Sequence, residues 1–377
     1  MDAEKITPGW LKEKFGWAVT QQDPVHTVEL ADGLMGRIYR VECAGQRFVY
    51  KTPPRGNSGW QQIFQETGLM NREVKAYNLL YENHPEIGKS IAPACYWAES
   101  SSDGNGALAL EDLTENAIQA SFANGLTYEQ VESAIRSFAR LHSISVTRHG
   151  NPLIALYDWV YTAKSEQLID AIRKGLHDVS NIMADRLPGL LSSSDLNHLL
   201  KIDIEETSIN AHKQSKIVSF CHGDPWSGNI LFKKTGNDRE MVKALLIDWQ
   251  FFMWGNPLTD VALLLMSSVD VEKRRQWTGK LLQKYCTELR QHSNIEYNIE
   301  DCCTDYRLAQ SYVGLLVFSS LEGYTNSMKP SEYSKLYLRA KGVMEEVPVL
   351  SSDFDQGHFG VATAIDFVGE VNTKRGV

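Results

Sequence analysis

The sequence lacks several features of secreted and membrane-bound proteins. Its 377 residues include only six cysteines, and none of these form a C-x-x-C pair. Cys302 and Cys303 are neighbours, and adjacent cysteines form a disulfide only with strain. The first 17 residues contain no apolar core of the signal-peptide kind. The longest apolar runs, such as 261–266, are far shorter than the roughly 20 residues of a membrane helix. We therefore predict reduced thiols, no membrane span and a cytoplasmic location.

Concentrated positive charge is also absent. The chain has 38 basic and 47 acidic residues, a net charge of −9, and no visible cluster of lysine or arginine. Nucleic acids and anionic membranes are bound through such clusters, so neither is an expected partner. No block is depleted in apolar residues, which argues against long disordered segments. The length exceeds the size at which one core keeps growing, so two packed units are expected.

The pattern of apolar residues and turns divides the chain into a β-rich part and a mainly helical part. Residues 1–112 form the first part, residues 113–350 the second, and residues 351–377 a tail with little periodicity. In the first part, strands are predicted at 27–30, 37–41, 47–51, 95–98 and 107–113, with a helix over 61–81. In the second part, helices are predicted at 127–142, within 155–215 and over 260–350, around a strand–loop–strand–strand block at 217–260. Thr127 is the expected N-cap of its helix, with Gln130 completing a capping box.

The segments HGDPWSGNILF (222–232) and ALLIDWQ (244–250) carry the most specific pattern. Asp224 and Asn229 are five residues apart, and Asp248 follows an apolar strand nineteen residues beyond Asn229. Phosphoryl transfer needs a carboxylate to accept a hydroxyl proton and hard oxygen ligands to hold Mg²⁺ against the phosphates. The D-x-x-x-x-N spacing is that of the protein-kinase catalytic loop. The pattern therefore predicts Asp224 as the base, and Asn229 and Asp248 as the metal ligands.

These two segments resemble the aminoglycoside phosphotransferase and choline kinase superfamily. Within it they are most similar to the ecdysteroid kinase-like branch, whose members pair an H-G-D-x-W-x-x-N loop with I-D-W-Q. The resemblance covers roughly residues 33–350. It implies an α+β, bilobal protein-kinase-like fold, with a small antiparallel sheet and a helix in the first lobe and a larger, mainly helical second lobe. It also implies that ATP binds between the lobes and a hydroxylated small molecule on the side of the helical lobe.

A kinase makes demands on the first lobe that can be checked separately. A lysine on the third strand must contact the α- and β-phosphates, and a glutamate on the following helix must hold it. Lys51 ends the third predicted strand, and Glu73 lies in the middle of the predicted helix. Glu66 is the competing acid on that helix; Glu73, followed by Tyr77, is more similar to the family pattern.

Further positions follow from the same resemblance. The phosphate-covering loop would be DGLMG (32–36), with Gly33 and Gly36 between two strands; the second glycine is alternatively only part of a hairpin turn. The hinge between the lobes would lie at Glu111 to Leu113, where adenine takes hydrogen bonds from the backbone. His142 is similar to a residue that supports the core of the second lobe. Asp260 is similar to the acid that ties the catalytic loop to the next helix, and it also suits a helix N-cap.

Several residues near these motifs have a structural interpretation beside the functional one. His222 is interpreted as a structural histidine that bonds backbone near the loop rather than as an acid or base. Trp226 and Trp249 either shape a substrate pocket or only pack against neighbours. Asp158 and Trp159 lie in the helical insert and could line an acceptor site, although solvated surface and core are the favoured interpretation.

We predict an ATP- and Mg²⁺-dependent phosphotransferase that moves the γ-phosphoryl group to a hydroxyl of a small molecule. A steroid, a choline-like compound, a sugar and an aminoglycoside-like compound all remain open as acceptors. One alternative is a kinase fold that binds ligand without turnover, although no base or metal ligand is lost. Another is a metal-dependent hydrolase using His222, Asp224 and Asp248, which would leave Lys51 and Glu73 unexplained. A protein kinase lacks support because H-R-D, D-F-G and A-P-E are absent, and no P-loop is present.

Overall fold

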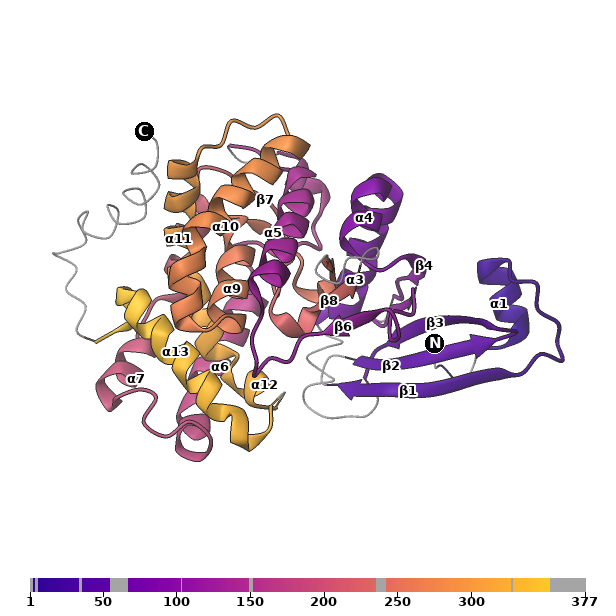
Figure 1. Cartoon of the computed structure of the whole chain (residues 1–377), viewed down its shortest axis with the longest axis horizontal. Coiled ribbons are helices and arrows are strands. Elements are labelled where there is room, and N and C mark those ends of the chain that lie inside the picture. The colour runs from indigo at the N-terminus through magenta and orange to yellow at the C-terminus, as the bar shows by residue number, and fades with distance from the viewer. Residues whose placement is uncertain are drawn as a thin grey trace.

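The computed structural model describes residues 3, 6–33, 36–54, 67–102, 104–148, 152–234, 242–326 and 328–352. A five-stranded antiparallel sheet near the N-terminus extends from a larger body of helices (Figure 1). Its strands, in spatial order, are β1 (Val25–Gly33), β2 (Gly36–Cys43), β3 (Gln46–Thr52), β5 (Ala107–Leu110) and β4 (Cys95–Glu99). A two-residue turn joins β2 to β3, because Cys43 pairs with Gln46. Ala44 and Gly45 both have positive φ there (49° and 76°), as the twist of a tight hairpin requires.

The two faces of this sheet bury different neighbours because side chains alternate along a strand. Phe48 and Tyr50 of β3 face the short helix α1 (Pro8–Phe15), in a small core to which Phe15 adds an edge-on ring contact. Leu108 and Leu110 of β5 face the other way and belong to the main core of the molecule. Lys51 therefore lies on the inner face, directed toward the helices, and not on the aromatic outer face.

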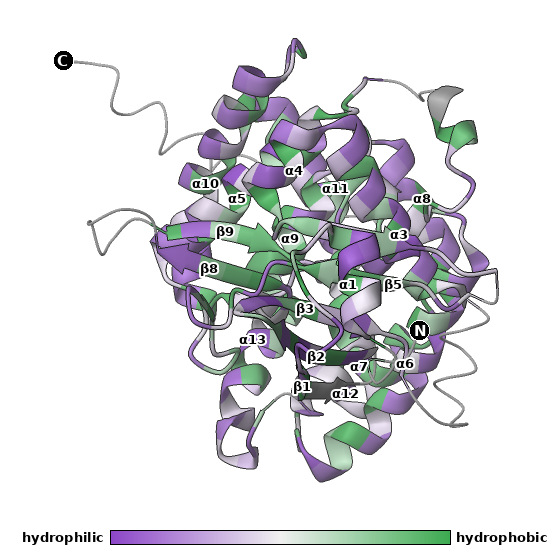
Figure 2. Ribbon diagram, turned by 90° about the vertical axis from the view of Figure 1, so that its right-hand side faces the viewer, coloured by the Kyte–Doolittle hydropathy of each residue, from purple (hydrophilic) through white to green (hydrophobic). Residues whose placement is uncertain are grey.

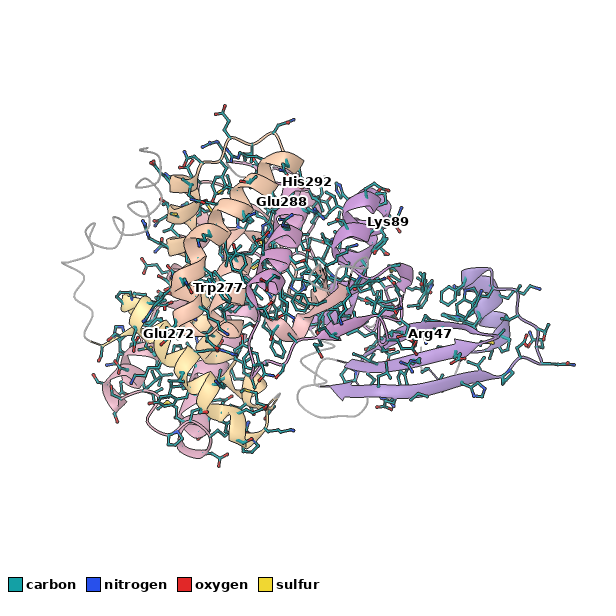
Figure 3. The ribbon with its side chains drawn as sticks, viewed as in Figure 1. Arg47, Lys89, Glu272, Trp277, Glu288 and His292 are labelled. Carbon is teal, nitrogen blue, oxygen red and sulfur yellow. The ribbon has the colours of Figure 1, made fainter. Side chains whose placement is uncertain are left out.

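Helix α3 (Leu69–Asn78) lies between the inner face of the sheet and the helical body (Figure 1). It continues into a π-helical turn (Leu79–Asn83) and is followed by α4 (Pro85–Ile91). Seven of its ten residues are buried, the charged Arg72 and Glu73 among them. Lys89 of α4 (Figure 3) also contacts strand β9 (Val242–Leu246). Its backbone carbonyl accepts a hydrogen bond from Lys243 Nζ at 2.9 Å.

The helical body is built around α9 (Leu258–Ser268), whose eleven residues are all buried. The middle of this helix, 261–266, is a run of apolar residues, which suits an interior position, and other helices surround it. Green, hydrophobic ribbon is concentrated on α9 and on the strands in front of it, whereas the outer helices are largely purple (Figure 2). The other helices are α5 (Tyr128–Ser143), α6 (Glu166–Asp185), α7 (Ser193–Leu199), α8 (Ile204–Lys213), α10 (Val271–His292), α11 (Ile299–Ser319), α12 (Leu321–Asn326) and α13 (Tyr333–Glu346).

An ion pair between Arg140 and Glu288 fastens α5 to α10. Arg140 of α5 lies 2.8 Å from the carboxylate of Glu288. His292, one turn further along α10, lies 3.2 Å from the same carboxylate (Figure 3). Glu288 is itself buried, so its charge is shielded less from these partners than that of an exposed pair would be.

Two small sheets lie in the second part of the chain. One contains β6 (Ala117–Gln119), β8 (Ile230–Lys234) and β9 (Val242–Leu246), and the other pairs β7 (Ser219–Cys221) with β10 (Met253–Gly255). Single 3₁₀ turns occur at Pro152–Leu156, Ser227–Asn229, Trp249–Phe251, Pro330–Glu332 and Pro348–Leu350. The turn at Ser227–Asn229 (η4) and the turn at Trp249–Phe251 (η5) lie in the two motif segments.

The predicted strands at 27–30, 37–41, 47–51 and 95–98 lie within β1 to β4, and the strand predicted to reach residue 113 ends at Leu110 instead. The helix predicted over 61–81 begins at Leu69 among the described residues, and 61–66 lie outside them. The capping box at the start of α5 is confirmed, since Gln130 N donates to Thr127 Oγ1 and Thr127 N to Gln130 Oε1. Helices α1 and α4 and strand β6 were not predicted, because they are too short for a clear period.

Protonation of His212 is predicted to destabilise the fold as the pH falls. Burial lowers the pKa of His212 from 6.5 to about 4, and its Nδ1 accepts a hydrogen bond from Asn256 N at 2.9 Å. The unfolded chain takes up this proton below pH 6.5 and the folded chain does not. The free energy of unfolding should therefore fall by up to about 1.4 kcal/mol per pH unit between 6.5 and 4 through this residue.

The test is urea denaturation at pH 7.5, 6.5 and 5.5 of the wild type and of His212→Asn, whose amide oxygen replaces the acceptor without titrating. The loss of stability between pH 6.5 and 5.5 should be smaller in the variant. Identical pH dependence in the two proteins would show that His212 does not contribute.

Candidate active site

Lys51, on the sheet, forms ion pairs with α3 and with the segment that follows β9. Its Nζ lies 2.7 Å from Glu73 Oε2 on α3 and 3.1 Å from Asp248 Oδ1 at the end of β9. The side chain of Lys51 is 9% exposed and that of Glu73 is 1% exposed. Burial favours the neutral amine, but the charges of Asp248 and Glu73 outweigh it and raise the pKa of Lys51. Lys51 is therefore positively charged. Glu66, the other acid considered as its partner, lies outside the described residues.

Asp224 and Asn229 lie side by side on the loop between β7 and β8. The amide of Asn229 donates from Nδ2 to the backbone carbonyl of Asp224 at 2.8 Å and to its Oδ2 at 2.9 Å. Burial raises the pKa of Asp224 well above its usual value, and the charge of Asp248 adds to this, while the hydrogen bond from Asn229 opposes it. A raised pKa makes this carboxylate a stronger base than an ordinary aspartate.

Gly223 gives the loop its path. Its φ is +88°, in the left-handed region, and a Cβ built there would lie 2.0 Å from the backbone oxygen of Phe251. Any larger residue would force the loop after β7 away from η5, the turn that directly follows Asp248. Glycine is thus required twice over at this position.

Asp248 has a strained backbone that directs its carboxylate. It is one of two non-glycine residues with positive φ among the described residues, with φ 65° and ψ 68°. Such outliers cost of order 1–3 kcal/mol and persist only where the surroundings enforce them. Here the backbone N of Ile247 donates to the carbonyl of Asn229 at 3.0 Å, which ties the end of β9 to the loop.

Asp260, in the first turn of α9, fixes the loop that carries Asp224. Its Oδ2 accepts from His222 N at 2.7 Å and its Oδ1 from Gly223 N at 3.0 Å. His142 Nε2 lies 3.1 Å from Oδ2, and the other nitrogen of that ring lies 2.8 Å from the hydroxyl of Tyr285. Cys221 also lies near His142 and Asp260. These three residues are nonetheless poor metal ligands, because both nitrogens of His142 already have partners.

His222 bridges the two motif segments in a structural manner. Its Nε2 lies 2.9 Å from the carbonyl of Ile247, and its Nδ1 accepts from Asp224 N at 3.3 Å. Burial lowers the pKa of His222, although Asp260 opposes this. Both ring nitrogens are therefore engaged, and neither has a lone pair free for a metal. This counts against a hydrolase site built on His222, Asp224 and Asp248.

A divalent cation fits the oxygen atoms that remain. Among the described residues, no hydrogen bond reaches Asn229 Oδ1 or Asp248 Oδ2. Asn229 Nδ2 is committed to Asp224, which leaves its Oδ1 as the free atom of the amide. Carboxylate and amide oxygens are hard ligands of the kind that Mg²⁺ takes. Asn229 and Asp248 are thus suitable for this ion.

In the segment 111–113, which the sequence predicts as the hinge, two backbone groups are available for hydrogen bonding. The carbonyl of Glu111 and the amide of Leu113 have no hydrogen-bond partner among the described residues. The amide of Glu111 donates to the carbonyl of Ala94, and the carbonyl of Leu113 accepts from the amides of Asn116 and Ala117. An acceptor and a donor two residues apart suit the edge of a purine.

The side chains of the hinge are engaged in ion pairs, which the sequence pattern did not indicate. Lys233 Nζ lies 2.8 Å from Glu111 Oε1. The buried carboxylate of Asp112 lies 3.0 Å from Arg40 Nε and 3.4 Å from Arg47 Nε. Because Arg40 and Arg47 belong to the sheet, these pairs fix the segment on both sides and hold its backbone in place.

The glycine turn between β1 and β2 lies next to Lys51. Gly33 pairs with Gly36 across the hairpin, and residues 34–35 lie outside the described residues. A Cβ on Gly36 would lie 2.8 Å from the backbone oxygen of Thr52 and 3.6 Å from Lys51 Cε. The close approach of the two strands at this point therefore requires glycine.

The two tryptophans of the motifs differ in their surroundings. Trp249 is fully buried, and its ring packs against those of Tyr77 and His222, so it is part of the core and not a pocket wall. Trp226 is partly exposed and contacts Phe122 and Tyr324.

Two further residues were missed by the sequence reasoning. Gln250 donates to Glu73 at 3.2 Å, and its place in the I-D-W-Q motif was the signal that could have found it. Arg72 stacks on Tyr161 across the site, and no local pattern indicates that contact.

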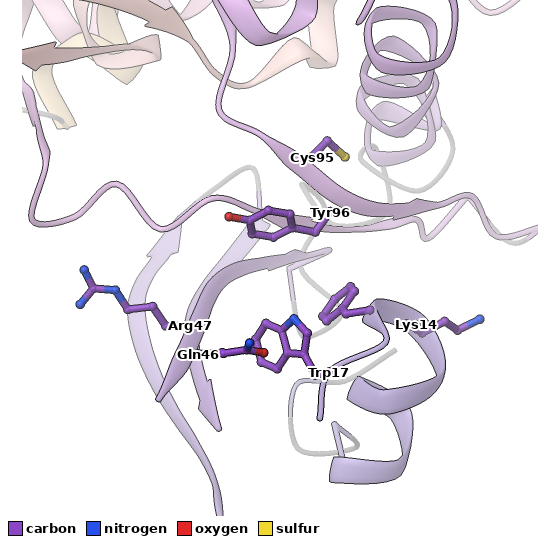
Figure 4. Close-up of a pocket in the computed structure, with 7 residues that line it drawn as sticks. Lys14, Trp17, Gln46, Arg47, Cys95 and Tyr96 are labelled. Atoms are coloured by element: carbon purple, nitrogen blue, oxygen red, sulfur yellow. The ribbon is translucent and has the colours of Figure 1, made fainter. Parts of the chain in front are cut away.

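A separate cavity lies on the outer face of the sheet. It has a volume of about 610 Å³ and opens between α1 and the first residues of β3 and β4 (Figure 4). Phe15, Trp17 and Tyr96 line it, and Arg47 and Lys14 lie at its edge with their charged ends turned away. Lys51 faces the opposite side of the sheet, so this cavity is not the site described above.

Comparison with known proteins agrees with the geometry. The family model of the ecdysteroid kinase-like family matches residues 31–295. The chain belongs to the ecdysteroid kinase-like family. No curated protein sequence matches it. No helix among the described residues is both long and apolar enough to cross a membrane.

Solved structures share the fold of this family member. Choline kinase from Cryptosporidium parvum Iowa II is 13% identical, with 93% of this chain and 98% of that chain covered and a TM-score of 0.54. Plasmodium vivax ethanolamine kinase is 15% identical, with 88% and 86% covered and a TM-score of 0.50. The predicted α+β kinase-like fold, with an antiparallel N-terminal sheet and a helical C-terminal region, is thereby confirmed.

Replacing Gly223 by alanine is predicted to cost far more stability than the same change at Gly45. Both glycines have positive φ, but nothing lies within 4 Å of a Cβ on Gly45. Gly45→Ala should lower the free energy of unfolding by about 1–2 kcal/mol from backbone strain alone. Gly223→Ala adds the clash with Phe251 O and should cost at least about 3 kcal/mol. Equilibrium urea denaturation measures both, and equal losses would contradict the assigned role of Gly223.

Proposed function

We propose that the protein is a kinase that transfers the γ-phosphoryl group of ATP to a hydroxyl group of a small molecule. The observation that carries this proposal is the convergence of Lys51, Glu73 and Asp248 within hydrogen-bonding distance, from three separate elements. A buried, paired lysine suits the contact with nucleotide phosphates. Membership of the ecdysteroid kinase-like family supports the same reaction class.

The nucleotide is proposed to lie between residues 1–112 and residues 113–350. Adenine would bond to the carbonyl of Glu111 and the amide of Leu113, the two hinge groups without a partner among the described residues. The phosphates would lie under the turn that contains Gly33 and Gly36 and against Lys51 Nζ. Glu73 orients Lys51 and takes no part in the chemistry.

Mg²⁺ would be held by Asn229 and Asp248, and when bound it supplies positive charge that neutralises the triphosphate. Asp224 orients the acceptor hydroxyl. As the hydroxyl oxygen bonds to the γ-phosphorus, the bond to the bridging oxygen of ADP breaks and the hydroxyl proton passes to Asp224. The buried setting that raises the pKa of Asp224 makes this transfer easier. Asp260 holds the loop still through the amides of His222 and Gly223.

The acceptor is proposed to be a hydroxylated small molecule of the steroid, choline-like, sugar or aminoglycoside-like classes. ATP consumption measured over a panel of these compounds identifies the class. ADP formation that depends on one of them establishes the kinase. Tight Mg-ATP binding without acceptor-dependent ADP formation across the panel would instead favour a binding protein without turnover.

Asp224→Asn should reduce kcat by about 10² or more, because the amide accepts no proton, while the affinity for Mg-ATP stays close to that of the wild type. Steady-state kinetics with the acceptor found in the panel, together with calorimetry, separates the two effects. Asp185→Asn makes the same chemical change at an exposed site and serves as the control. A kcat near the wild-type value in Asp224→Asn would refute the assignment of the base.

Asp248→Ala should abolish the Mg²⁺ dependence of nucleotide binding, because it removes a carboxylate ligand of the ion and a charge partner of Lys51. Calorimetry with ATP in the presence of Mg²⁺ and in the presence of EDTA measures that dependence. The same affinity for Mg-ATP in wild type and variant would show that Asp248 is not a metal ligand.

A further inference from the structure

Helix α3 contacts the helical body at two separate places. The first is η5, the turn after Asp248, through the hydrogen bond from Gln250 to Glu73. The second is the part of the helical insert (145–215) that precedes α6. There the guanidinium carbon of Arg72 lies 3.6 Å from the centroid of the Tyr161 ring. This second contact joins the helix that carries Glu73 to a part of the chain far from both motifs.

The guanidinium of Arg72 is buried against the Tyr161 ring. Its residue exposure is 8%, yet its Nε has no hydrogen-bond partner among the described residues. The hydrogen bond from its Nη2 to the carbonyl of Thr67 is long, 3.4 Å. A buried cation is costly unless something compensates it, and an aromatic face within about 6 Å does so. Burial lowers the pKa of Arg72, and Tyr161 opposes that effect.

Tyr161 is fixed in the helical body by its own backbone. Its amide donates to the carbonyl of Phe252 at 3.2 Å, and its carbonyl accepts from Trp254 N at 2.7 Å. Its ring also stacks on that of Phe251, with centroids 6.4 Å apart. Tyr161 is 4% exposed. The ring is thus a rigid surface on which α3 rests.

The contact between Arg72 and Tyr161 affects the ion pair between Glu73 and Lys51. Arg72 and Glu73 are neighbours, so any slide or rotation of α3 that separates Arg72 from Tyr161 also moves Glu73 relative to Lys51. The pair of Glu73 and Lys51, 2.7 Å long, tolerates little displacement. A second cation on the same helix, Lys75, lies 5.9 Å from the Trp159 ring and is exposed, so it is a weaker version of the same contact.

We propose that Tyr161 is a positioning residue: its ring holds Arg72, and through it helix α3, in the register at which Glu73 pairs with Lys51. Tyr161 touches neither nucleotide nor acceptor in this role. The proposal rests on the proposed function only in that the paired Lys51 serves a nucleotide. It makes the insert before α6 a determinant of nucleotide binding.

The test compares Tyr161→Leu, which removes the ring, with Tyr161→Phe, which keeps it. Arg72→Gln removes the cation from the other side and also serves if Tyr161→Leu does not fold. Lys75→Met is the matched control on the same helix. Two quantities are measured: the Kd of Mg-ADP by calorimetry, and hydrogen exchange of the amides of α3 relative to those of α5.

Tyr161→Leu and Arg72→Gln should each weaken Mg-ADP binding by about 5- to 10-fold and speed exchange in α3 but not in α5. Tyr161→Phe and Lys75→Met should stay within about 2-fold of the wild-type Kd. The double variant Arg72→Gln/Tyr161→Leu should be no worse than either single variant, because one contact is lost in all three.

A purely structural role has a different outcome. Tyr161→Leu would then lower the Tm and leave both the Kd and the exchange of α3 unchanged, which would overturn the proposal. If the wild type binds no Mg-nucleotide, the proposed function fails. The exchange of α3 in Tyr161→Leu and Arg72→Gln still decides the positioning role in that case.

Discussion

The structure depends on the way in which one buried ammonium group is neutralised. A lysine that is almost out of contact with water must have its charge paired, since an unpaired buried charge is far too costly to keep. Lys51 takes one partner from α3 and one from the end of β9, so three elements from distant parts of the sequence must meet within 3.1 Å. The strained backbone of Asp248 and the bond from Gln250 to Glu73 serve this one meeting point.

A second constraint keeps the loop of Asp224 in place. The carboxylate of Asp260 accepts hydrogen bonds from two backbone amides of this loop. His142 bonds Asp260, and the hydroxyl of Tyr285 bonds the other nitrogen of His142. Three of these four hydrogen bonds are buried, where a hydrogen bond is stronger than in water. The loop is therefore rigid before any ligand arrives, and the groups proposed to act on the phosphate and the hydroxyl are preorganised.

The elements that sequence reasoning located are those with local signals. Strands showed alternation, α5 showed its capping box, and Asp224, Asn229 and Asp248 lie in two short segments with a specific spacing. The contact of Arg72 with Tyr161 and the ion pairs of Asp112 with Arg40 have no such signal, because each joins segments whose approach is decided by the whole fold. The role of α1 was hidden for the same reason: its aromatic residues pack on β3 and β4 and make no repeat of their own.

The distribution of the hydrophobic core bears on how a ligand could enter. The apolar residues of α3 and the inner residues of β5 belong to the same continuous core as α9 and its neighbours, whereas only the outer face of the sheet has a core of its own. Swinging the sheet away as a rigid body would expose that shared surface, at about 25 cal/mol for each Å². A rigid-body opening of the sheet is therefore opposed by the shared core, and the backbone of segment 111–113 stays fixed relative to β2, β3 and β8.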